Sequence, residues 1–241
     1  MHCQPIRNSL VNIWLNNNQM CLLCGRQGEQ PLALCLDCET ELPWLAGGCD
    51  QCALPGPAGL CPACRLQPPP FSQVEAPLAY AFPVDALVAR FKHQARWPLG
   101  RLLGALLSRH LQHRYSAGLP RPEVLLPVPL ARKRLRQRGF NQAQMLAGWL
   151  AKALGLAVDN RQLLRPRETL AQQRLLLAER QYNLNGAFAL AAPTRLRGRH
   201  VALVDDVMTS GATARVLASL LRDAGAARVD VYCLARTPKP A

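Results

Sequence analysis

The chain has 241 residues, 49% of them hydrophobic, which is enough to bury the core of one large domain or of a main domain with a small annex. Lysine and arginine number 29 against 15 acidic residues, and the net charge of +14 favours anionic partners, such as phosphorylated small molecules or nucleic acid. Aromatic residues make up only 5%, which argues against a surface built purely for base stacking.

The first part of the chain carries little apolar sequence. Residues 1–20 contain one arginine and one short apolar patch, at Leu10, Val11, Ile13, Trp14 and Leu15. The patch is too brief for the apolar core of a secretory signal or for a membrane span. We therefore expect a cytoplasmic protein without a membrane span, beginning with a short helix.

Cysteines dominate the next segment. Eight of the ten form four C-x-x-C pairs at near-equal spacing: Cys21/Cys24, Cys35/Cys38, Cys49/Cys52 and Cys61/Cys64. Two such pairs supply four thiolates to one tetrahedral zinc ion, so we expect two structural Zn²⁺ sites, with one zinc and degenerate pairs as the alternative. Pairing in chain order and interleaved pairing fit the spacing equally well. A disulfide framework is disfavoured without a secretory signal, and thioredoxin-like chemistry needs only one pair, at a helix start.

This cysteine-rich segment is too small to bury a core of its own, so metal binding would supply folding energy directly. The run Pro68-Pro69-Pro70-Phe71 follows as a stiff, extended connector. We therefore predict a leading helix and a double zinc ribbon in residues 1–67, a connector in 68–71 and the main domain in 72–241.

The main domain is predicted to alternate strands and helices. A short strand is expected at Val74–Tyr80, helices at Val84–Lys92 and Pro98–Arg114, and an apolar strand at Val124–Pro129. Three histidines lie on or beside these helices, and we interpret them as solvated or packing residues rather than ligands or catalysts: His93, His110 and His113.

An intensely basic segment follows the strand that ends at Pro129. Its cations are Arg132, Lys133, Arg134, Arg136 and Arg138. We expect an irregular loop here, and a loop after a parallel strand faces the ligand crevice of an open α/β sheet. Arg132, Arg134, Arg136 and Arg138 are therefore candidates for binding a polyanion, and a solvated charge run is the plain alternative. An amphipathic helix over Met145–Ala153, closed by Gly155, comes next.

The most informative stretch is Val201–Thr213. Four apolar residues without alternation predict a strand buried on both faces, which Asp205 and Asp206 end. A loop of small residues then leads into a helix with an apolar stripe over Val216–Ala224, stopped by Gly225; the loop residues are Thr209, Ser210, Gly211, Ala212 and Thr213. Its backbone N–H groups and hydroxyls can cradle a phosphate, whereas the carboxylates suit sugar hydroxyls or Mg²⁺. Together these parts describe a ribose 5-phosphate site.

This stretch resembles the phosphoribosyl pyrophosphate signature of type I phosphoribosyltransferases. The resemblance implies that Asp205 and Asp206 hold the ribose 2- and 3-hydroxyls, that Thr209–Thr213 holds the 5-phosphate and that Mg²⁺ accompanies the diphosphate. It also implies that the segment with Arg132, Arg134, Arg136 and Arg138 takes the pyrophosphate. An acidic pair that merely caps the next helix would leave the hydroxyl-rich loop unexplained. A Walker A loop occurs nowhere in the chain. A last apolar strand at Val229–Leu234 completes the predicted parallel sheet.

Four features in order resemble the ComF/GntX family of competence-associated, phosphoribosyltransferase-like proteins. They are the C-x-x-C pairs, Pro127-Val128-Pro129 with Arg134–Gln142, the pattern Thr169, Gln172, Leu175, Arg180, Asn183, Gly186, Ala187 and Phe188, and Val201–Thr213. The resemblance spans Cys21 to Thr237, although several C-x-x-C turns lack the usual Pro and Gly. Arg180 and Asn183 would belong either to a cover over the site or to a packed helix surface.

The fold class that follows is α/β: a type I phosphoribosyltransferase-like parallel sheet flanked by helices, preceded by a small four-cysteine zinc-ribbon module. Three functions stay open. One is a phosphoribosyltransferase whose acceptor the sequence does not reveal, and another is a non-catalytic sensor of phosphoribosyl pyrophosphate or nucleotides. The third, implied by the family, is a factor that handles internalised single-stranded DNA together with DNA-processing proteins, in natural transformation or DNA utilization.

Overall fold

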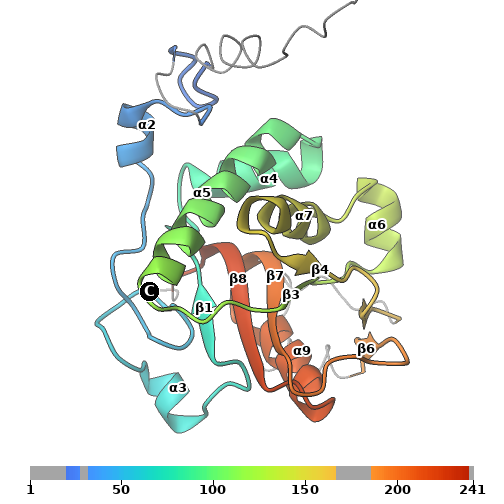
Figure 1. Ribbon diagram of the computed structural model, residues 1–241. Helices are drawn as coiled ribbons and strands as arrows, with labels where there is room; N and C mark the ends of the chain where they lie inside the picture. Colours follow the sequence, from blue (N-terminus) through green and yellow to red (C-terminus); the bar gives the residue numbers. More distant parts are fainter. Residues whose placement is uncertain (1–19, 28–31, 167–185, 239–241) are drawn as a thin grey trace, which may run out of the picture. The chain divides into compact units, whose positions relative to one another are not determined.

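A computed structural model describes residues 20–27, 32–166 and 186–238 (Figure 1). The chain forms two compact units, residues 1–42 and 43–241. Within the first unit, helix α2 (Leu36–Thr40) follows a turn that contains Cys21 and Cys24. The predicted leading helix lies outside the described residues. No helix in the described part of the chain is both long enough and apolar enough to cross a membrane.

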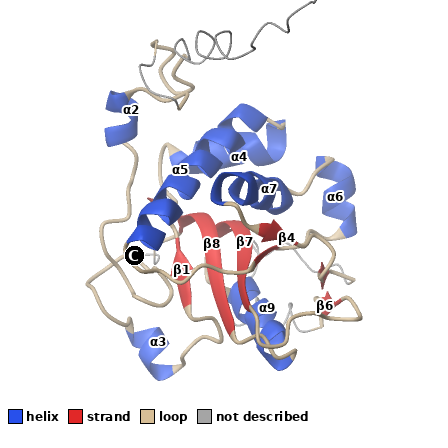
Figure 2. Cartoon of the chain, in the orientation of Figure 1, coloured by secondary structure: helices blue, strands red, loops and turns tan. Residues whose placement is uncertain are grey.

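The second unit is built on a parallel sheet in which the strands run in the order β1, β8, β7, β3, β4, with β2 also paired to β8 (Figure 2). The strands are β1 (Gln73–Glu75), β2 (Leu78–Ala79), β3 (Val124–Pro127), β4 (Ala157–Val158), β7 (His200–Met208) and β8 (Arg228–Arg236). Val201 pairs with Val124 on one side and Val229 on the other. All four residues of Val201–Val204 are fully buried, as their unbroken apolar run predicts.

Helices cover both faces of the sheet. One face carries α4 (Val84–Gln94), α5 (Trp97–Ser116) and α7 (Gln142–Leu154), and α9 (Ala212–Asp223) lies on the other (Figure 1). Helices α4 and α5 approach closely because Gly100 has no side chain; a Cβ there would lie 2.6 Å from a ring atom of Phe91. The second unit also contains the short helix α3 (Pro62–Leu66) and an antiparallel pair of strands, β5 (Leu163–Leu164) and β6 (Ala189–Leu190).

Three sequence-based expectations differ from the structure. The strand that begins at His200 continues through both aspartates to Met208, because β8 offers pairing partners along this whole length. The strand expected at Val74–Tyr80 divides into β1 and β2 around Pro77, which has no N–H for the ladder.

The third difference is the basic segment, which is a helix, α6 (Arg132–Arg138), rather than an irregular loop. Its composition explains this, since arginine, lysine, leucine and glutamine are all good helix formers. The helix ends at Gly139, whose φ of 81° is left-handed.

The second group of cysteines belongs to the same compact unit as the sheet. Cys49, Cys52 and Cys64 are buried in one apolar core with Phe71 and Met208. This core reaches the carboxyl end of β7, and so it joins the cysteine group to the sheet. The domain boundary at residues 68–71 stays a prediction. Apolar packing is continuous across it, because residues on both sides of the boundary share this core.

Candidate functional site

A cleft of about 530 Å³ opens where β3 and β7 end. Its walls come from the residue after β2, the end of α4, the segment after β3 with α6 and the start of α7, the residue Arg165 after β5, and the end of β7 with the following loop and the start of α9. The polar residues that line it are Tyr80, Lys92, His93, Arg134, Gln137, Arg138, Gln142, Arg165, Asp205, Asp206, Thr209 and Thr213. Two carboxylates thus share one cleft with four basic side chains, from Lys92, Arg134, Arg138 and Arg165.

The two aspartates differ in their surroundings. The Asp206 side chain is 6% exposed; its Oδ1 lies 2.8 Å from Lys92 Nζ, and its buried Oδ2 has no hydrogen-bond partner among the described residues. The backbone N–H of Asp206 donates to Asp205 Oδ1 at 2.8 Å. Burial, reinforced by the neighbouring Asp206 charge, raises the pKa of Asp205 to about 7. The pair therefore presents acceptor atoms that hydroxyl donors or a cation would stabilise.

The loop after β7 has the shape that its sequence predicts. Gly211 has a φ of 77° and precedes the first residue of α9, and a Cβ on it would lie 2.5 Å from Met208 Cε. Only glycine satisfies both conditions at this position. A small cavity of about 70 Å³ adjoins the loop and is lined by Thr209, Gly211, Ala212 and Thr213 among others. Backbone N–H groups at the start of a helix of this length favour an anion.

The basic helix divides into two sets. Arg134 and Arg138 line the cleft, whereas Arg132 and Arg136 are exposed and do not. Arg138 donates to Gln142 Oε1. Burial lowers the pKa of Arg138; the charge of Asp206 opposes this shift, and the charge of Arg134 adds to it. An anionic ligand would stabilise this partly buried cation.

Sequence reasoning missed several residues of the cleft. Lys92 was expected only as the end of a helix, and His93 only as a solvated or packing residue, yet both line the cleft beside Asp206. Burial lowers the pKa of His93, and the charges of Arg138 and Lys92 add to the effect. Arg165 lies over the Phe188 ring at 5.1 Å from its centroid. No local motif marks these positions, because their partners come from distant parts of the chain. The candidate cover residues Arg180 and Asn183 lie outside the described residues.

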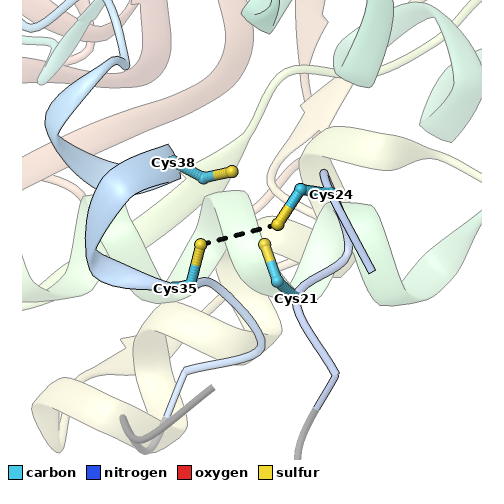
Figure 3. Close-up of side chains that lie close together, drawn as sticks. All are labelled: Cys21, Cys24, Cys35 and Cys38. Atoms are coloured by element: carbon cyan, nitrogen blue, oxygen red, sulfur yellow. Dashed lines mark hydrogen bonds between the residues drawn. The ribbon is translucent and has the colours of Figure 1, made fainter. Parts of the chain in front are cut away.

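The eight paired cysteines form two clusters in chain order, so the interleaved alternative is wrong. Cys21, Cys24, Cys35 and Cys38 make the first, which Figure 3 shows with all four sulfurs converging, and Cys49, Cys52, Cys61 and Cys64 make the second. Within each cluster the Sγ atoms lie within 4.8 Å of one another. Cys24 and Cys35 Sγ are 3.6 Å apart, and Cys52 and Cys61 Sγ are 3.8 Å apart.

These spacings fit zinc. A tetrahedral site with Zn–S bonds of about 2.3 Å has sulfurs about 3.8 Å apart. Burial alone would raise the pKa of Cys49, but N–H groups of Cys61, Cys52 and Gln51 outweigh it and lower that pKa to about 6. Burial and the neighbouring thiols raise the pKa of Cys64. Four such thiols ionise together only when a cation balances them, so each cluster is a donor set that could hold Zn²⁺.

Comparisons with known proteins agree with this architecture. The family model described as "Phosphoribosyl transferase domain" matches residues 136–241. The DNA utilization protein YhgH of Salmonella typhi is 38% identical over 226 residues, covering 90% of this chain and 97% of that protein. Competence protein F of Haemophilus influenzae is 32% identical over 238 residues, covering 98% and 96%.

Among solved structures, the glutamine phosphoribosylpyrophosphate amidotransferase of B. subtilis, complexed with ADP and GMP, aligns with a TM-score of 0.37 and 22% identity. The alignment covers 56% of this chain and 26% of that one. The domain match, the parallel sheet with flanking helices and the two cysteine clusters confirm the predicted fold class. Because its relatives align over nearly their whole length, the chain belongs to the ComF family of competence and DNA-utilization proteins.

Proposed function

We propose that the cleft binds phosphoribosyl pyrophosphate together with Mg²⁺. The observation that carries the proposal is that an acidic pair, two hydroxyl residues of the loop before α9 (Thr209 and Thr213) and four basic side chains line one cleft. In this assignment Asp205 and Asp206 accept hydrogen bonds from the ribose 2- and 3-hydroxyls, and Thr209–Thr213 donates to the 5-phosphate. Asp206 Oδ2, which has no hydrogen-bond partner in the part of the chain that the structure describes, is an acceptor that such a hydroxyl would satisfy.

The cations of the cleft suit the diphosphate. Arg134 and Arg138 from α6, with Lys92 from α4 and Arg165, supply positive charge on the walls that face the acidic pair. Mg²⁺, when bound with the ligand, supplies further charge neutralisation to the diphosphate oxygens. Carboxylate oxygens are suitable donors to that ion or to its water ligands.

If transfer occurs, the C1–O bond to pyrophosphate breaks and its electron pair leaves with pyrophosphate. The cationic walls then stabilise the charge that develops on the leaving group. A lone pair of the acceptor forms the new bond to C1, and the acceptor's proton passes to solvent or to a base. The carboxylates hold the ribose ring in place during this change. Phosphoribosyl transfer is the reaction that this site suits. The proposal assigns no acceptor.

We further propose that the protein handles internalised single-stranded DNA, in natural transformation or DNA utilization. Its relatives in Salmonella typhi and Haemophilus influenzae, a DNA utilization protein and a competence protein, support the link, as does the net charge of +14. Arg132 and Arg136 lie outside the cleft on an exposed face of α6, where they are available to a phosphate backbone. A non-catalytic sensor of the phosphoribosyl ligand, or a DNA-binding adaptor on the same fold, is the second candidate.

Isothermal titration with phosphoribosyl pyrophosphate and Mg²⁺ tests the ligand. We expect the wild-type protein to bind and the double variant Asp205→Asn/Asp206→Asn to lose binding while it keeps its far-UV circular dichroism. Glu123→Gln is the matched control, because Glu123 is an exposed carboxylate that pairs with Arg199 next to the amino end of β3. Equal affinity of the double variant and the wild type would show that the carboxylates are assigned wrongly.

A further inference from the structure

We propose that Arg236 couples the second cysteine cluster to the loop after β7, so that zinc in Cys49, Cys52, Cys61 and Cys64 sets the geometry of the phosphate-binding residues. The ligand-affinity part of this inference rests on the proposed function, whereas the coupling itself does not. Arg236 acts here as a positioning residue and has no assigned contact with a ligand.

The hydrogen bonds of Arg236 connect the two sites directly. Arg236 is the last residue of β8 and is 4% exposed. Its Nε donates to the carbonyl of Cys52 at 2.9 Å. Its Nη1 donates to the carbonyl of Met208 at 3.0 Å and to the carbonyl of Thr209, with Thr237 as a further acceptor at 3.1 Å. One guanidinium thus joins the cluster to the last residue of β7 and the first residue of the loop.

The charge of Arg236 also supports a link to the second cysteine cluster. All its hydrogen-bond acceptors are backbone carbonyls, and among the described residues no carboxylate lies within ion-pair distance of it. A buried cation without a counter-charge is costly. Four thiolates around one Zn²⁺ carry two net negative charges, so a loaded second cluster provides the balancing charge on the side of the Cys52 carbonyl.

Packing gives a second route between the same sites. Met208 lies in the apolar core with Cys49, Cys52 and Cys64, and its Cε lies 2.5 Å from the position that a Cβ on Gly211 would take. Any shift of the cluster that moves Met208 therefore reaches the turn of the loop. In addition, Arg215 in the first turn of α9 donates to the carbonyl of Gln67, directly after α3.

Loss of zinc from the second cluster would free the Cys52 carbonyl and remove an acceptor and the counter-charge from Arg236. The carbonyls of Met208 and Thr209 would then be held less firmly, and the N–H groups of the loop would lose their fixed direction. Because coupling between two sites is reciprocal, a ligand in the cleft should in turn tighten the binding of this zinc.

Hydrogen exchange of the full-length, zinc-loaded protein tests the coupling without any ligand. We expect faster amide exchange in the peptide that contains Thr209–Thr213 for Arg236→Met, with Arg236→Lys in between because an ammonium reaches fewer carbonyls. Arg222→Met is the control, since Arg222 also donates to backbone carbonyls, those of Ala226 and Ala227 next to the opposite end of β8. Exchange in Arg236→Met at the wild-type rate would overturn the proposal.

Titration with phosphoribosyl pyrophosphate and Mg²⁺ then separates the two proposals. Arg236→Met is expected to bind about tenfold more weakly than wild type, within the range usual for coupled sites. If the wild type does not bind but exchange is still faster in Arg236→Met, the proposed ligand is wrong and the coupling is supported. If the wild type binds and Arg236→Met binds equally well with unchanged exchange, the coupling is wrong.

A second variant keeps the test decisive if Arg236→Met does not fold. Cys61→Ser alters the least buried ligand of the second cluster and retains Arg236. It should bind one zinc fewer, by elemental analysis, and should show the same faster exchange in the loop. Loss of that zinc with unchanged loop exchange would contradict the coupling. In the wild type, removal of one zinc should need a higher chelator concentration when the phosphoribosyl ligand is added.

Discussion

Asp205→Asn should make the ligand-free protein more stable at pH 8 than the wild type, and should leave it about equally stable near pH 4. Burial and the adjacent Asp206 raise the pKa of Asp205 from 3.8 to about 7. A carboxyl whose pKa is raised by folding favours the folded state fully below pH 3.8, and this stabilisation is lost as the pH rises through 7. Asparagine cannot ionise, so the variant does not lose stability in this way as the pH rises.

The size of the effect follows from the shift. About three pKa units at roughly 1.4 kcal/mol each set an upper limit of about 4 kcal/mol. Asp205 lines an open cleft and keeps some exposed surface, so solvent reduces the effect, and we expect about 2 kcal/mol. The aspartates titrate as a pair, so the difference should develop broadly between about pH 4, where Asp205 ionises in the unfolded chain, and about pH 7, where it ionises in the folded protein.

Urea unfolding of both proteins at several pH values measures this difference. Titration of the zinc ligands affects both proteins alike and cancels when their unfolding free energies are subtracted. A difference that is the same at pH 5 and pH 8 would refute the reasoning, because it would mean that Asp205 ionises as easily in the folded protein as in the unfolded one.

Three further predictions concern the charges and the metal. Lys92→Met should destabilise the ligand-free protein by about 2 to 3 kcal/mol in urea unfolding, because it leaves Asp206 as a buried, unpaired carboxylate; a loss below about 0.5 kcal/mol, the size of a surface effect, would contradict this. Arg132→Gln/Arg136→Gln should weaken binding of single-stranded DNA and lower its dependence on salt in fluorescence anisotropy, with little change in phosphoribosyl affinity. An unchanged salt dependence would show that neither arginine contacts the DNA backbone. Elemental analysis should find two zinc ions per chain, and a strong chelator should remove both and lower the melting temperature; a single zinc would leave one cluster without its metal.

Local patterns were sufficient for much of the fold. The apolar runs located β3, β7 and β8, and the stripe over Val216–Ala224 located α9. The loop after β7 was also readable, because Gly211 and its hydroxyl neighbours, which we propose to bind phosphate, stand in consecutive positions. The same holds for the cysteine pairs, whose spacing alone indicates a metal site.

Long-range contacts were not readable in this way. Lys92 contacts Asp206, and Arg236 contacts the Cys52 carbonyl, but nothing near either cation in the sequence indicates its partner. The chain order of the two cysteine clusters was likewise open until the sulfurs were placed. For α6, the two prolines before it favoured a loop, whereas the helix propensity of its own residues decided the outcome.

The central claim is that the cleft of Asp205, Asp206 and Thr209–Thr213 is a phosphoribosyl pyrophosphate site. The most direct test is a calorimetric titration of the wild-type protein with that ligand and Mg²⁺, at about 50 mM and about 500 mM salt, beside the same titrations with a short single-stranded DNA. Our account predicts one phosphoribosyl ligand per chain at both salt concentrations, while DNA binding falls steeply as salt rises. Absence of phosphoribosyl binding at both salt concentrations, with DNA still bound at low salt, would contradict it.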